Sequence, residues 1–137
     1  MSTESLRTAG IVLVVFPTVV FGGASLLWHW ITRQTTYYDH PLRRGLWRAG
    51  HAHAGVLLIL TLVAVDLVDQ ADLSSGWKQV VRITIPAAAL LLPIAFFLSI
   101  ARPDAQRPNR LINLAYVGAV SLVAGTLTLG VGLLRAT

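Results

Sequence analysis

Apolar residues fall in four long blocks separated by short polar segments. The blocks cover approximately residues 9–31, 49–68, 80–101 and 111–134. At a rise of about 1.5 Å per residue, a helix over each block is long enough to cross about 30 Å of hydrocarbon. No block shows the strict alternation of a barrel strand, and backbone groups in lipid must be satisfied within the segment. The pattern therefore predicts an all-α integral membrane four-helix bundle.

Composition supports a single transmembrane domain over residues 1–137. The chain is 55% hydrophobic and 12% charged, against about 25% charged residues in ordinary soluble domains. The first block lacks a clear A-x-A cleavage site, so we expect it to remain as a helix of the mature protein. Tryptophans near expected helix ends match the aromatic belts of membrane interfaces; they are Trp28, Trp30, Trp47 and Trp77.

The basic residues predict an orientation. The chain has 11 lysines and arginines against 6 acidic residues, an excess that in a soluble protein would suggest nucleic acid as a partner. Here the basic residues lie at the ends of the spans, so we expect a lipid bilayer and no nucleic acid as partner. One side carries Arg33, Arg43, Arg44, Arg48, Arg102, Arg107 and Arg110, and the other carries Arg7, Lys78, Arg82 and Arg135. Because basic loops stay inside, we expect both termini on the outer side of a bacterial inner membrane.

The absence of cysteine narrows the possible cofactors. It excludes thiolate zinc sites, iron–sulfur clusters, covalently attached haem and disulfides. All four histidines are expected on one side of the membrane, near the same membrane face; they are His29, His40, His51 and His53. Non-covalent haem needs one or two histidines from facing helices, so we expect haem b near the cytoplasmic face, held by His51 or His53 together with His29. Arg44 and Arg48 precede His51 and would pair with the propionates.

Helix geometry argues against a clamp made of His51 and His53. At 100° per residue their side chains diverge by about 200°, so both cannot reach one ion from a regular helix. In the first span Thr18, Gly22, Ser25 and His29 share a face whose small residues admit a neighbouring helix or a flat cofactor. A second hypothesis is a copper or zinc ion held by His29, His51 and His53 with His40.

Other polar and small residues complete the set of candidates. Asp66 and Asp69 follow His51 on one face of the second span and suggest a proton or ion path. Asn113 and Tyr116 begin the fourth span at the expected depth of the histidines. Small residues recur every seven positions at Gly118, Gly125 and Gly132, which predicts close helix packing.

The stretch "WRAGHAHAGVLLILTLV" resembles the His-x-His helix start of small four-helix membrane proteins that are themselves similar to parts of haem–copper oxidase subunit I. The resemblance rests on His51, His53 and Gly55 with the apolar run after them. It implies haem at one of the two histidines. A second, deep histidine pair for a copper centre is missing, so oxygen reduction is not implied.

These features lead to three expectations about function. No nucleophile elbow, phosphate loop or H-E-x-x-H motif occurs, so we expect no independent catalytic activity. The leading hypothesis is a haem protein for electron transfer, sensing or haem handling. The alternative is an accessory or assembly subunit that packs in a larger membrane complex or a homo-oligomer. The third is a small proton or ion transport component.

Overall fold

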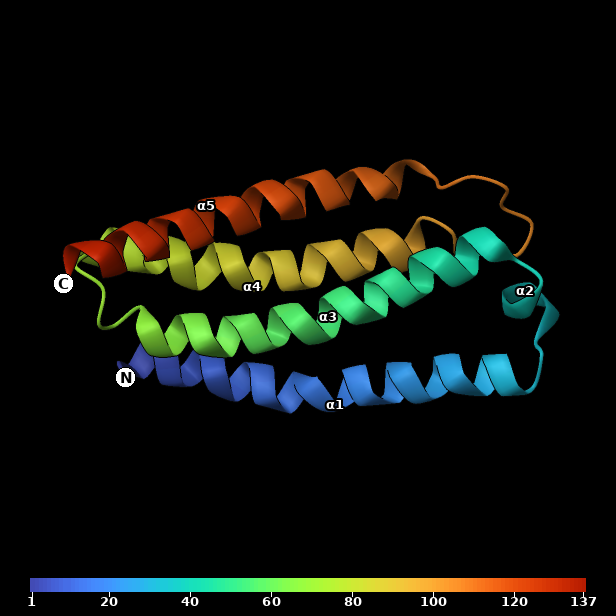
Figure 1. Ribbon diagram of the computed structural model, residues 1–137, viewed down its shortest axis with the longest axis horizontal. Helices are drawn as coiled ribbons and strands as arrows, with labels where there is room; N and C mark the ends of the chain where they lie inside the picture. The colour runs from blue at the N-terminus through green and yellow to red at the C-terminus, as the bar shows by residue number, and fades with distance from the viewer.

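The computed structural model describes residues 1–137 and is built from helices alone (Figure 1). The elements are α1 (Thr3–Ile31), α2 (Thr35–Tyr38), α3 (Pro41–Leu67), α4 (Ser75–Leu98), the 3₁₀ turn η1 (Arg110–Asn113) and α5 (Leu114–Arg135). Four helices are long and apolar enough to cross a membrane: α1, α3, α4 and α5 with η1. The prediction of a four-helix membrane bundle is confirmed.

The four long helices lie side by side in chain order, with α1 and α5 outermost (Figure 1). Both termini lie at one end of the bundle, and α2 lies at the other end. Helix α1 is the most weakly buried of the four, because Ser5 and Val12 are its only buried residues. Helix α1 therefore contributes few residues to the buried core.

Helix α3 begins at Pro41, whereas hydropathy placed its start near residue 49. His40 caps it, because His40 Nδ1 accepts a hydrogen bond from the Arg43 amide at 3.1 Å. Proline is favourable at the first helical position, where its missing N–H leaves no bond unmade. The 27 residues of α3 span about 40 Å, longer than the hydrocarbon, so its first turns are polar. Hydropathy thus marked the part of the helix in lipid rather than the whole helix.

In the heptad of small residues, Gly118 and Gly125 lie where α5 packs on α4, and Gly132 lies against Leu73 in the α3–α4 connection. Gly118, Gly125 and Gly132 are buried. A Cβ atom at Gly125 would lie 2.6 Å from Ile85 Cγ1, and one at Gly118 would lie 3.0 Å from Leu92 Cγ. Side chains at these positions would therefore push the two helices apart.

Arg43 joins the segments at the end of the bundle where α2 lies. Its side chain is buried, its Nε donates to the Ile100 carbonyl at 3.2 Å, and its terminal nitrogens donate to the Thr36 carbonyl at 2.6 Å and to the Arg102 carbonyl. The guanidinium carbon also lies 5.3 Å from the centre of the Trp47 ring. The buried charge is thus compensated by carbonyl dipoles and an aromatic face rather than by a carboxylate.

Asp69 holds the opposite end, where the termini lie. Its carboxylate pairs with Arg82 at 2.5 Å and accepts the Ser2 backbone N–H at 2.5 Å. Arg82 also donates to the hydroxyls of Ser2 and Ser5 at 3.0 Å and 3.1 Å. This cluster joins the start of α1 to the α3–α4 connection and to α4.

Candidate ligand site around His51

His51 faces α1 across a contact that two glycines make possible. A Cβ atom at Gly23 would lie 2.9 Å from His51 Cε1 and 3.0 Å from its Nε2, and one at Gly22 would lie 3.7 Å from Nδ1. The half-buried imidazole therefore lies against the backbone of α1. Among the four histidines, His51 alone forms no hydrogen bond through either ring nitrogen.

Two hollows meet at His51. The larger, a cleft of about 680 Å³ between α1 and α3, is lined by Gly23, Leu26, Leu27, Trp30, Tyr37, Arg48, Ala49, His51 and Ala52. The smaller, of about 210 Å³, lies among α1, α3 and α4 and is lined mainly by apolar residues. Pockets for organic cofactors commonly measure about 300–1,000 Å³. The larger cleft is thus of a size that accepts an organic ligand.

Arg48 is the cationic group of this cleft. It lies one turn before His51 on α3, is exposed, and forms neither a hydrogen bond nor an ion pair. Arg44, by contrast, donates to the Tyr38 carbonyl at 2.7 Å and lies 5.5 Å from the centre of the Trp30 ring. Arg48 is therefore available to an anionic ligand group, whereas Arg44 is engaged in holding α2 and α1.

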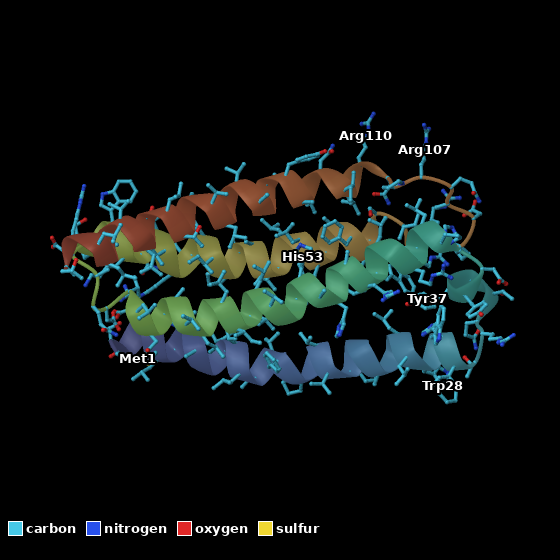
Figure 2. The ribbon with its side chains drawn as sticks, viewed as in Figure 1. Met1, Trp28, Tyr37, His53, Arg107 and Arg110 are labelled. Atoms are coloured by element: carbon cyan, nitrogen blue, oxygen red, sulfur yellow. The ribbon has the colours of Figure 1, made fainter.

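His53 leaves α3 on a different side. It is exposed, its ring centre lies 5.2 Å from that of Phe96, and Figure 2 shows it toward α4. Its Nδ1 donates to the Ala49 carbonyl at 2.7 Å. The two rings of the His-x-His motif therefore serve different surroundings, and His51 is the one at the α1–α3 cleft.

His29 lines neither of the two hollows that His51 lines. Its ring packs edge-on against Tyr37 and Trp47, with ring centres 5.8 Å and 6.3 Å away. Trp47 precedes His51 by four residues, which is about 6 Å along α3. His29 Nδ1 donates to the Ser25 carbonyl at 2.6 Å, and its Nε2 forms no hydrogen bond. The structure does not bring His29 and His51 together as a facing pair.

The remaining polar candidates lie apart from this cleft. His40 Nε2 donates to the Ala105 carbonyl at 2.8 Å, and Asp69 is held by Arg82. The other three candidates are exposed; they are Asp66, Asn113 and Tyr116. No three histidine or acidic side chains converge in a way that could hold a metal ion. The structure thus offers no assembled ligand set for the copper or zinc hypothesis.

Tyr37 is a site residue that the sequence interpretation missed. It is 2% exposed, lines the cleft, and stacks on Trp47 with ring centres 6.0 Å apart. Figure 2 shows it between α3 and the end of α1. The stretch "TTYY" lies in the polar segment between the first two apolar blocks, yet it forms α2. It contains no glycine or proline, which is the signal that could have revealed a helix.

Comparison with known proteins adds no relative to this description. No protein-family model, curated protein or solved structure matches the chain.

Proposed function

We propose that this protein binds haem b in the cleft between α1 and α3, with His51 as the protein ligand to iron. The observation that carries the proposal is the His51 imidazole, which has no hydrogen-bond partner and opens onto a cleft of about 680 Å³. An ionisable residue within a membrane span usually has a functional partner. A neutral imidazole surrounded by apolar and small residues is the ordinary protein ligand of haem.

The other residues of the cleft suit the same ligand. Gly22 and Gly23 let the imidazole lie against the α1 backbone at the border of the cleft, and Trp30 and Tyr37 add flat aromatic walls. Arg48 would pair with a propionate through a charge-assisted hydrogen bond. The cofactor would supply reversible one-electron chemistry or the binding of a small ligand at iron. Because His29 does not face His51, a single protein ligand favours haem sensing or haem handling over electron transfer.

An absorption spectrum of the purified protein tests the proposal. Protein made in haem-supplied cells and purified in detergent should show a Soret band that His51→Ala abolishes. His53→Ala is the matched control, because His53 lies on the same helix but outside the cleft, and this variant should keep the band. Arg48→Gln should weaken haem retention by roughly tenfold or more, the usual effect of losing a charge-assisted hydrogen bond. A folded wild-type protein without the band contradicts the proposal.

An accessory role in a larger membrane complex is the second candidate. It is favoured by α1, an outer helix with many large apolar side chains exposed along its length, Val14 and Phe21 among them. Co-purification of larger membrane subunits with a colourless protein would support it. Ion transport has less support, because Asp69 is held in an ion pair.

A further inference from the structure

The connection between α4 and α5 carries a group of cationic side chains that is separate from the His51 cleft. A hollow of about 560 Å³ on this connection is lined by Arg102, Arg107 and Arg110 together with polar neighbours. Arg107 and Arg110 are exposed and form neither a hydrogen bond nor an ion pair. Arg102 approaches Asp104 at 3.4 Å, but both side chains are more than 70% exposed, so this ion pair is weak. The hollow has an excess of available positive charge.

The backbone beneath these arginines is fixed from two sides. Arg43 donates to the carbonyls of Ile100 and Arg102, and His40 donates to the Ala105 carbonyl. The Asn109 amide donates to the Ser99 carbonyl at 2.8 Å, which closes the connection at its base. The guanidinium groups are therefore presented from an ordered backbone, which lowers the entropy lost when an anion binds.

The direction of the side chains indicates where the anion lies. Figure 2 shows Arg107 and Arg110 both extending sideways, across the direction of the helices and away from the bundle on the α5 side. The helices cross the membrane along the long direction, so a sideways direction at their ends leads into the headgroups of surrounding lipids. A soluble anion would instead approach along the direction of the helices. Geometry therefore favours a lipid as the source of the anion.

We propose that Arg107 and Arg110, assisted by Arg102, bind the phosphate of an anionic phospholipid headgroup. Guanidinium groups pair with phosphate through two parallel hydrogen bonds, and basic residues beside a membrane span attract anionic lipids. The site shares no residue with the His51 cleft. The lipid proposal and the haem proposal can therefore fail separately.

Native mass spectrometry of the delipidated full chain, titrated with phosphatidylglycerol or phosphatidylcholine in detergent, tests the site. The wild type should retain phosphatidylglycerol in preference to phosphatidylcholine. In the double variant Arg107→Gln/Arg110→Gln, affinity for phosphatidylglycerol should fall about thirtyfold, since each basic residue near a membrane surface contributes about a factor of five. The control is Arg7→Gln/Arg135→Gln, which removes two exposed arginines at the other end of the bundle and should retain the lipid.

Three outcomes would overturn the proposal. The first is equal retention by the double variant and the wild type, and the second is an equal loss in the control, which would indicate attraction by net charge alone. The third is displacement of phosphatidylglycerol by millimolar inorganic phosphate, which would indicate a soluble anion as the ligand. Thermal unfolding in phosphatidylcholine should be the same for all variants, because the replaced side chains are exposed and form no hydrogen bond or ion pair.

Discussion

At the scale of single residues, Arg43 has the largest predicted effect on stability. Arg43→Met would keep most of the side-chain volume but leave the carbonyls of Thr36, Ile100 and Arg102 without their donor. A buried polar group left without a partner costs about 1–3 kcal/mol, so we expect the free energy of unfolding to fall by about 3 kcal/mol. Denaturant titration in detergent measures this. Arg107→Gln, which removes an exposed arginine, should stay within about 0.5 kcal/mol of wild type, and equal stabilities of the two variants would contradict the role of Arg43.

Gly23 is the residue that allows α1 to approach His51. In Gly23→Ala the new methyl group would lie 2.9 Å from the imidazole, so either the ring or α1 must move. We expect a loss of about 1–3 kcal/mol, the usual effect of overpacking, together with weaker haem retention. Gly10→Ala is the matched control on the same helix, because a Cβ atom there meets nothing within 4 Å. It should leave the protein unchanged or stabilise it by up to about 1 kcal/mol, since alanine favours helix. An equal effect of both substitutions would refute the close contact.

At the scale of elements, the attachment of α1 depends on Asp69 and should depend on pH. Burial alone raises the pKa of Asp69, but hydrogen bonds from the Ser2 backbone, the Ser5 and Ser2 hydroxyls and Arg82 outweigh it and lower this pKa to about 2. A lowered pKa means that the carboxylate stabilises the fold above about pH 4 and that this contribution is lost as the pH falls toward 2. We therefore expect wild type to be more stable than Asp69→Asn at neutral pH and the difference to shrink between about pH 4 and 2. Unfolding across this range measures it, with the exposed Asp66→Asn as control; a difference independent of pH would contradict the assignment.

Hydropathy predicted the four long helices, because the hydropathy of a span depends on that one segment alone. The angular separation of His51 and His53 belongs to a single helix, so it could be stated from the sequence. The position of His29 relative to His51 could not be predicted, because it depends on how α1 packs against α3. In that packing His29 lies against Trp47, and Gly23 lies against His51. The burial of Arg43 could not be predicted, since nothing in its neighbours along the chain indicates the carbonyls that surround it.

At the scale of the whole molecule, the structure places both termini at one end of the bundle and α2 with the α4–α5 connection at the other (Figure 1). The basic residues number 7 on the α2 side, from Arg33 to Arg110, and 4 on the side of the termini. Since basic segments remain in the cytoplasm, we expect the termini outside the cell membrane and Gln106 inside.

The absence of cysteine makes this topology directly measurable, because a single introduced thiol is the only target for a maleimide. Thr137→Cys and Gln106→Cys both replace exposed residues at opposite ends of the bundle. In spheroplasts, a membrane-impermeant maleimide should label Thr137→Cys directly and Gln106→Cys only after permeabilisation. The reverse result would invert the orientation and place Arg107 and Arg110 in the outer leaflet. Labelling of both variants in intact spheroplasts would show that the difference in basic residues is too small to set one orientation.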